Sequence, residues 1–261
     1  MIGKNKTKLI KSLEYKKYRE IHQLFLAEGN KIVKELVHSG IEIKTVIGTS
    51  DYLREIKMQI KSGVEIIEAT ESEMKSASLL KNPQGAIALC QVPVNNIEEA
   101  DPSEKLIICL DNIQDPGNLG TIIRIADWFG IEDVVCSLST ADIFNPKSVQ
   151  ASMGSICRVK VHYIELPCFL ASISDKTDFR AGAFMEGDNL YTTNLPKSGI
   201  LVVGNEGRGI SDEVIPFINQ KISIPAFTST VNRAESLNAA IATAIFCSEF
   251  RRQEMFGNYS K

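Results

Sequence analysis

The sequence predicts an α/β protein in which a small α/β unit precedes a larger one built on a mostly parallel sheet with helices on both faces. In residues 106–261, apolar strand candidates alternate with helix candidates, a pattern typical of a parallel sheet covered on both sides. Residues 93–105 interrupt the pattern, because two prolines bracket a polar, acidic stretch. We therefore assign residues 1–95 to a first domain, 96–105 to a linker and 106–261 to a second domain.

Helix and strand signals alternate in the first domain. Residues 11–27 are a helix candidate whose apolar side chains lie near one face, namely Tyr15, Tyr18, Leu24 and Phe25. Asn30 is placed to cap a second helix, and Gly40 follows as a stop signal. Thr70 with Glu73 predicts a capping box for a short helix. The remaining expected elements are a helix over 51–60 and strands over 41–48, 64–67 and 85–92.

The second domain contains six apolar strand candidates, over 106–110, 133–136, 158–163, 180–184, 200–203 and 221–224. Helix candidates lie between most of them, including 119–129, 146–151 and 212–218, and a long helix closes the chain over about 236–255. Ligands of such sheets bind beyond the carboxyl ends of the strands. The loops that follow these strands are therefore the place to look for chemistry.

Composition excludes several classes of protein. Hydrophobic residues make up 44% and charged residues 23%, close to the average of globular domains. No apolar run approaches the roughly 20 residues of a membrane helix. The basic N-terminal segment has no apolar signal core after it, so we expect a cytoplasmic protein. Six scattered cysteines and three isolated histidines, without metal-ligand spacing, predict reduced thiols and no metal site.

The charge is unevenly distributed along the chain. The net charge is −3, but residues 1–95 hold 15 Lys/Arg against 11 Asp/Glu, whereas residues 96–261 hold 14 against 21. Residues 1–20 alone carry seven basic and two acidic groups. Such a basic arm on an acidic body can contact the phosphates of a nucleic acid, although a solvated terminus would have the same composition.

Three loops that follow predicted strands carry the candidate site. In the first, Pro116-Gly117 forms a tight turn, Asn118 is placed as a helix N-cap, and Arg124 follows on that helix. A structural cap and a surface salt bridge are the alternative interpretations of Asn118 and Arg124. Since the residues around Arg124 are apolar, we favour an arginine that points into a polar site.

The second loop is rich in glycine, and the third opens the last helix. Gly204, Gly207 and Gly209 let backbone approach a ligand closely, but their spacing fits neither a dinucleotide fingerprint nor a phosphate-binding P-loop. A tight turn without a ligand is the alternative. The third loop runs from Ile224-Pro225 to Ser236-Leu237-Asn238, where Ser236 or its neighbours can cap the closing helix.

Together these loops resemble the motifs of the SpoU (TrmH) family of RNA 2′-O-ribose methyltransferases, within the SPOUT superfamily. The residues that carry the resemblance are Asn118-x-Gly120-xxx-Arg124-x-Ala126-xxx-Gly130, the run Leu201 to Ile210, and Ile222-Ser223-Ile224-Pro225 followed by Glu235-Ser236-Leu237-Asn238. Segments 145–147 and 151–154 also look like this family. Phe25, Glu28-Gly29 and Pro83-Gln84-Gly85 resemble its RNA-binding domain, so the similarity covers nearly the whole chain. The loop over 226–235 is longer than the family pattern.

The resemblance implies a trefoil knot, S-adenosylmethionine as the cofactor, and a homodimer whose sites border the subunit interface. It implies that Gly204, Ile224 and Leu237 contact the cofactor, mainly through backbone groups, and that Glu206, Gly207, Ser236 and Asn238 complete its site. It gives Arg124 the catalytic role, with Asn118 and Glu206 beside it. An arginine base is unfavourable because a guanidinium stays protonated in proteins, so we expect Arg124 to stabilise the developing alkoxide and to orient a phosphate.

The predicted reaction is transfer of a methyl group to a ribose 2′-hydroxyl of structured RNA, with rRNA favoured over tRNA. The alternatives are a tRNA methyltransferase, a catalytically silent RNA-binding or ribosome-assembly factor on the same fold, and a generic nucleotide-binding α/β enzyme. The intact motif residues argue against a silent factor, and the long 226–235 loop argues for one. We expect RNA and a second copy of the chain as partners, and neither a membrane nor a metal.

Overall fold

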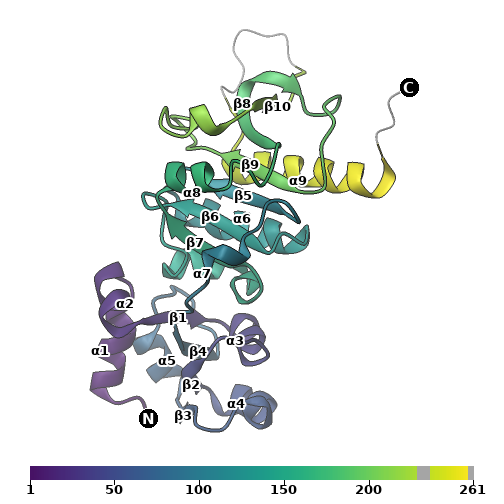
Figure 1. The fold of residues 1–261 in the computed structure, drawn as a ribbon. Helices are drawn as coiled ribbons and strands as arrows, with labels where there is room; N and C mark the ends of the chain where they lie inside the picture. The colour runs from purple at the N-terminus through teal and green to yellow at the C-terminus, as the bar shows by residue number, and fades with distance from the viewer. Residues whose placement is uncertain (228–235, 258–261) are drawn as a thin grey trace. The chain divides into compact units, whose positions relative to one another are not determined.

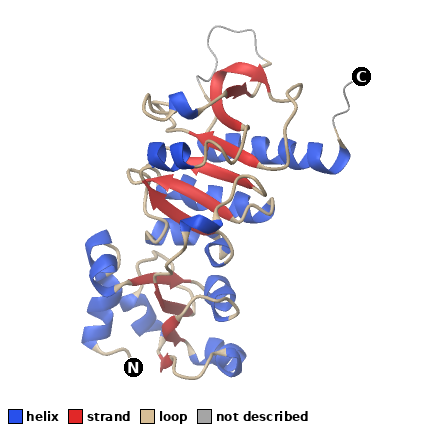
Figure 2. Ribbon diagram, in the orientation of Figure 1, coloured by secondary structure: helices blue, strands red, loops and turns tan. Residues whose placement is uncertain are grey.

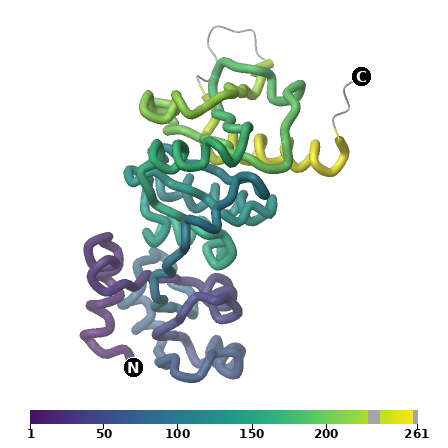
Figure 3. The backbone as a smooth tube through the Cα atoms, viewed as in Figure 1, coloured from purple at the N-terminus to yellow at the C-terminus, as the bar shows by residue number. Residues whose placement is uncertain are grey.

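The computed structural model describes residues 1–227 and 236–257, which form two compact units. Unit 1 comprises Met1–Val94 together with Asp142–Arg158, and unit 2 comprises Asn95–Ala141 and the chain from Val159 onward. The chain, traced as a tube in Figure 3, therefore leaves unit 1 after Val94, contributes residues 142–158 to it and then leaves it again. The returning segment lies within the predicted second domain, and its place in unit 1 is a property that the sequence pattern did not predict.

Unit 1 is a four-stranded mixed sheet with helices around it (Figure 1). The strand order is β1-β4-β2-β3, in which only β2 and β3 are parallel. The Thr70–Glu73 capping box at the start of α5 is present, as predicted. In chain order the helices and strands are α1 (Lys4–Ser12), α2 (Lys16–His22), β1 (Leu24–Glu28), α3 (Asn30–Val37), β2 (Ile43–Gly48), α4 (Ser50–Ile56), β3 (Glu65–Glu68), α5 (Glu71–Ala77), β4 (Ala86–Gln91) and α7 (Pro146–Ser152), with a 3₁₀ turn at Lys57–Gln59 and another at Ser155–Cys157.

The predicted helix over 11–27 is wrong. Two short helices and a strand occupy that region, because Gln23 adopts a left-handed conformation (φ 51°) and ends α2. Leu24–Glu28 then pairs antiparallel with β4, with Phe25 opposite Cys90, and Phe25 and Leu26 are fully buried. A short apolar run has the same local pattern in a strand and in a buried helix, and here the partner strand decides.

Unit 2 is a six-stranded parallel sheet in the order β10-β8-β9-β5-β6-β7, with helices on both faces (Figure 2). This agrees with the predicted fold class. Helix α8 was not predicted, and the helix expected over 212–218 is only a 3₁₀ turn at Ile215–Phe217. The elements are β5 (Leu106–Leu110), α6 (Pro116–Trp128), β6 (Asp133–Ser137), β7 (Lys160–Ile164), α8 (Leu166–Ser172), β8 (Arg180–Asn189), β9 (Gly199–Val203), β10 (Gln220–Ser223) and α9 (Ala239–Phe256), with a further 3₁₀ turn at Ile97–Glu99.

The sheet of unit 2 separates two apolar layers. On one face α8 packs with Phe169 and Leu170 against Ile107 and Cys109 of β5. Helices α6 and α9 pack on one another and complete the core. Strands β5, β6 and β9 are buried along their whole length, as expected for a parallel sheet covered on both sides. Each fully buried Leu, Ile or Phe contributes about 1.5–3 kcal/mol, so this core rigidly fixes the strand ends.

A buried charge cluster lies at the amino ends of β5 and β6, with His162 from the middle of β7 beside it. Asp133 is fully buried and contacts Lys105 Nζ at 2.5 Å and His162 Nε2 at 2.8 Å. Burial raises the pKa of Asp133, but the hydrogen bonds from His162 and Lys105 outweigh burial and leave that pKa below its ordinary value. This cluster is at the sheet edge opposite the strand ends that carry the motif loops, and it therefore has a structural role.

Candidate active site

The carboxyl ends of β5 and β9 bring the first and second motif loops together. These strands are neighbours in the sheet, with Leu110 opposite Val203. Asp111 N donates to Val203 O at 2.9 Å, which extends the pairing by one residue. Asp111 is buried, and its Oδ2 accepts a hydrogen bond from Ser211 N at 2.7 Å. The side chain at the end of one strand therefore fixes the far end of the loop that follows the other.

Asn205 organises the glycine loop. Its Oδ1 accepts hydrogen bonds from Gly207 N at 2.9 Å and Arg208 N at 3.0 Å, while its Nδ2 donates to Asn112 O at 2.8 Å. Its backbone N and O exchange two hydrogen bonds of 2.9 Å with Gly209. The loop is thus closed on itself and joined to the loop after β5.

Gly204 is required by a close approach of backbone. A Cβ at this position would lie 2.3 Å from Gly209 C and 2.4 Å from Ile210 N, distances that real Cβ atoms essentially never show. At Gly207, in contrast, the nearest atom to an added Cβ is Asn205 Oδ1 at 3.7 Å. Gly204 closes the loop, whereas Gly207 and Gly209 leave a surface of bare backbone beside the Glu206 side chain.

Asn118 connects all three motif loops. Its Nδ2 donates to Glu206 Oε1 at 2.6 Å, and its Oδ1 accepts from Asn238 Nδ2 at 3.0 Å. The expectation that Asn118 caps α6 is wrong, since Asp115 is the cap and accepts a hydrogen bond from Asn118 N at 2.8 Å. Pro116 favours the first helical position, which makes the preceding residue the cap. The amide of Asn118 is therefore left to bridge the second and third loops.

Arg124 is not part of this hydrogen-bonded set. It lies six residues farther along α6 than Asn118, about 9 Å along the helix axis. It is exposed, and among residues 1–227 and 236–257 it has no hydrogen-bond or ion-pair partner. Thr121 and Trp128 lie on the same exposed side of α6. Arg124 is thus a cation that is available to an anionic ligand.

The other residues predicted for cofactor binding follow β9 and β10 or precede α9. Ile224 is half-buried directly after β10, while Ser236 and Leu237 are exposed just before α9. Asn238, and not Ser236, caps α9, with its Oδ1 accepting from Ala240 N at 3.0 Å. Glu235 and most of the long 226–235 loop lie outside the described residues.

The sequence analysis missed Asp111, Asp115 and Asn205 as site residues. All three have polar side chains in the loops after β5 and β9, and their hydrogen bonds to backbone shape those loops. Their position in the sequence could have identified them, because polar residues directly after a buried parallel strand lie at the ligand-binding edge of such a sheet.

Within the described parts of the chain, no group of three or more His, Cys, Asp or Glu side chains is placed to hold a metal ion. All six cysteines are free thiols, and burial raises the pKa of four of them, Cys90, Cys109, Cys136 and Cys247. No described helix has the length and apolar character needed to cross a membrane.

The motif geometry coincides with a family match. Residues 105–248, more than half of the chain, match the model of the SpoU rRNA Methylase family. The chain belongs to the SpoU rRNA methylase family. This confirms the resemblance found in the motifs. Residues 4–88 of this SpoU family member match the MRM3-like substrate binding domain, which corresponds to most of unit 1.

Individual relatives of this SpoU family member are similar over nearly their full length. The 23S rRNA guanosine 2′-O-methyltransferase RlmP of Bacillus subtilis is 30% identical over 94% of this chain and 96% of its own. A TrmH-family putative RNA methyltransferase from Porphyromonas gingivalis is 40% identical, with a TM-score of 0.87 over 97% of this chain and 99% of its own. An AdoMet-bound rRNA methyltransferase from Sinorhizobium meliloti is 28% identical, with a TM-score of 0.84 over 95% of this chain and 94% of its own.

Proposed function

We propose that this protein transfers a methyl group from S-adenosylmethionine to a ribose 2′-hydroxyl of ribosomal RNA. The observation that carries the proposal is the Glu206–Asn118–Asn238 hydrogen-bonded chain, which joins the three SpoU motifs at one sheet edge. The named reaction of the relative RlmP, which matches almost end to end, points to the same substrate class. The match of residues 4–88 to a substrate-binding domain supports a role of unit 1 in holding the RNA.

The residues present fit the cofactor. Gly207 and Gly209 have no side chain to keep a ligand away from their backbone, and the neighbouring Glu206 supplies a negative charge. The exposed side chain of Leu237 supplies apolar contact. When bound, S-adenosylmethionine supplies a methyl group that its positively charged sulfur has already activated. We propose that Gly204, Gly207, Ile224, Ser236 and Leu237 hold it, chiefly through backbone groups.

The chain's own task is to place the RNA and to stabilise charge. Arg124 cannot act as a base at neutral pH, because an arginine guanidinium stays protonated in proteins. Its side chain has no hydrogen-bond or ion-pair partner among the described residues, so it can bind a phosphate next to the target ribose. It can also favour the negative charge that develops on O2′ as this oxygen attacks the methyl carbon and its proton passes to solvent water. Asn118 donates to the Glu206 carboxylate and orients it at the site, and Asn238 in turn donates to the Asn118 amide oxygen.

We further propose a homodimer. Trp128, the only tryptophan, is 84% exposed on α6, and Ile241 is 53% exposed on α9, which packs against α6. Exposed apolar side chains on adjoining helices favour association with a second copy. Trp128 is on the same side of α6 as Arg124, so a dimer contact there would border the site. Burial of Trp128 would shift its fluorescence to shorter wavelength, and Trp128→Glu would give a monomer in sedimentation.

Two further parts of the proposal concern topology and location. We propose that the loops after β9 and β10 take part in a trefoil knot, which the strand order β10-β8-β9-β5 supports. We also propose a cytoplasmic location, because the bacterial relatives named as 23S rRNA methyltransferases act on an RNA of that compartment.

The decisive experiment combines methyl transfer with cofactor binding. Purified protein is incubated with methyl-labelled S-adenosylmethionine and unmodified rRNA transcripts, and the 2′-O-methyl nucleotide is mapped by mass spectrometry. Arg124→Ala is expected to lower kcat about 10²–10³-fold, as loss of one group that stabilises transition-state charge does. Its affinity for S-adenosylmethionine should stay within about twofold of the wild type, because Arg124 is assigned to RNA and not to the cofactor.

Lys197→Ala removes another exposed cation of unit 2 and serves as the control. Its methyl-transfer activity should equal that of the wild type. Loss of cofactor binding in Arg124→Ala would contradict its assigned role. Tight binding of S-adenosylmethionine without methylation of any rRNA would favour the silent RNA-binding factor instead.

A further inference from the structure

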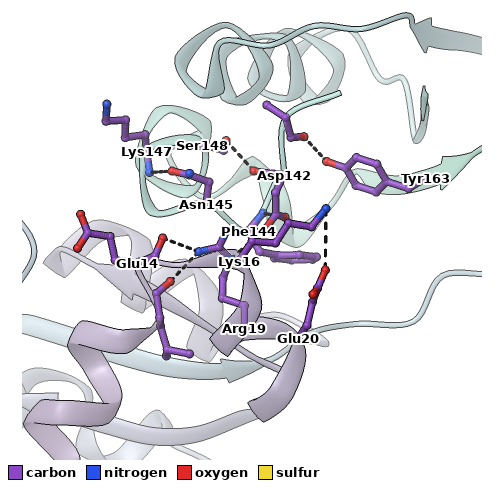
Figure 4. A network of polar contacts seen from close by, with 12 residues as sticks. Glu14, Lys16, Arg19, Glu20, Asp142, Phe144, Asn145, Lys147, Ser148 and Tyr163 are labelled. Carbon is purple, nitrogen blue, oxygen red and sulfur yellow. Dashed lines mark hydrogen bonds and ion pairs between the residues drawn. The ribbon is translucent and has the colours of Figure 1, made fainter. Parts of the chain in front are cut away.

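Helix α2 in unit 1 is held by a buried arginine. Arg19 is the one buried residue of this helix, with 4% of its surface exposed. Its Nη1 donates to Leu13 O at 2.7 Å and Glu14 O at 2.9 Å (Figure 4). Its Nε and Nη2 donate to Asp142 Oδ2 at 2.9 and 2.7 Å. Since Arg19 provides the anchor, the apolar side chains of α2 are not needed for packing.

Those apolar side chains are exposed. Tyr15 and Ile21 are each 61% exposed and Tyr18 is 40% exposed, and His22 is exposed as well. Spacings of three and four residues place Tyr15, Tyr18 and His22 on one side of the helix. Tyr15 and Tyr18 have ring centroids 6.5 Å apart at 71°, and Tyr18 and His22 have centroids 6.5 Å apart with planes only 17° apart. Three aromatic rings thus form an ordered, solvent-facing row.

Positive charge surrounds this row. Lys11, Lys16 and Lys17 are exposed, and among the described residues Lys11 and Lys17 have no carboxylate partner. Lys16 and Glu20 are 3.9 Å apart with more than 60% of each side chain exposed, so this pair contributes little. The buried Arg19 is already neutralised by Asp142. The exposed lysines of this segment, Lys11, Lys16 and Lys17, outnumber its exposed carboxylates, Glu14 and Glu20, so the net local charge is positive and complementary to a polyanion.

We propose that Tyr15, Tyr18 and His22 form a stacking platform for unpaired bases of the RNA substrate, with Lys16 and Lys17 holding the adjacent phosphates. Bases in a duplex have both faces covered by neighbours, whereas bases in loops and bulges can stack on aromatic side chains. The lysines supply affinity and the rings supply the preference for unpaired RNA. This inference rests on the proposed function only in taking RNA as the substrate.

The test uses the full-length protein and an unpaired RNA of about 12 nucleotides, compared with the same RNA annealed to its complement. Tyr15→Leu/Tyr18→Leu keeps apolar area but removes the aromatic faces. Its affinity for the unpaired RNA should fall about tenfold or more, with little change for the duplex. Tyr15→Phe/Tyr18→Phe should stay within about twofold. Met58→Ala removes another exposed apolar side chain of unit 1 and should change neither affinity.

Two readouts separate stacking from a structural effect. Quenching of 2-aminopurine in the unpaired RNA should be lost in the leucine variant and kept in the phenylalanine variant. Lys16→Gln/Lys17→Gln should lower the slope of log K against log salt by about 1.4, or ~0.7 per phosphate contact, without changing the quenching.

Equal affinity of the wild type and the leucine variant for unpaired RNA would overturn the proposal. A changed oligomeric state in the leucine variant, with RNA affinity intact, would also overturn it and would assign the surface to a protein contact. The proposed function is measured separately. A wild-type protein that binds unpaired RNA but methylates no rRNA would contradict the proposed function, whereas the stacking platform would still be supported.

Discussion

Gly204→Ala tests the close approach that shapes the glycine loop. The new Cβ would lie 2.3–2.5 Å from three backbone atoms of Gly209 and Ile210. Backbone at both ends of a closed loop cannot move aside as a flexible side chain can. Overpacking of this kind costs about 1–3 kcal/mol. For a unit of this size, each kcal/mol lowers Tm by about 2–4 °C, so we expect the melting transition of unit 2 to fall by about 2–12 °C.

The assay is calorimetry with and without S-adenosylmethionine, and Gly207→Ala is the control for the ligand-free melt. An alanine Cβ at Gly207 would meet only Asn205 Oδ1 at 3.7 Å, so the ligand-free Tm should stay within about 1 °C. Cofactor at a hundred times Kd should stabilise the wild type by about 2.7 kcal/mol and Gly204→Ala by much less. A Tm of Gly204→Ala equal to that of the wild type would refute this reasoning. An equal decrease of the ligand-free Tm in Gly204→Ala and Gly207→Ala would refute it as well.

Three further predictions concern side chains that fix loops or charges. Asn118→Ala removes the link to Glu206 and should lower kcat for methyl transfer at least tenfold, with a cost of about 1–3 kcal/mol in a urea melt of unit 2; unchanged kcat would show that the link does not matter to catalysis. Arg19→Ala leaves Asp142 without its partner and should destabilise unit 1 by about 3 kcal/mol in urea, whereas a loss below about 1 kcal/mol would contradict the anchoring role. Asp133→Asn should lower the free energy of unfolding at neutral pH. Because the pKa of Asp133 is lowered in the folded state, this loss should be constant above about pH 5 and shrink as the pH falls below about 4. A loss of stability that grew in acid would contradict this prediction.

Local sequence signals predicted the elements whose conformation depends on adjacent residues. The buried strands β5, β6 and β9 were predicted from short apolar runs bounded by loops, and the Thr70–Glu73 capping box from two residues three apart. The start of α6 could have been predicted correctly, because Pro116 identifies Asp115 as the cap. The strand at 24–28 could not, since its periodicity is also that of a helix and only pairing with β4 distinguishes the two.

The sequence by itself determined the fold class, the family and the identity of the motif residues. These properties depend on the hydrophobic periods of strands and helices and on motif spacings, which involve residues close together in the chain. Only the tertiary structure decided that Asn118 bridges Glu206 and Asn238, which are 88 and 120 residues away. It also decided that Asp142 binds Arg19, 123 residues earlier, and so placed residues 142–158 in unit 1. Hydrogen bonds between such distant residues depend on how the elements pack, and no local pattern in the chain specifies that packing.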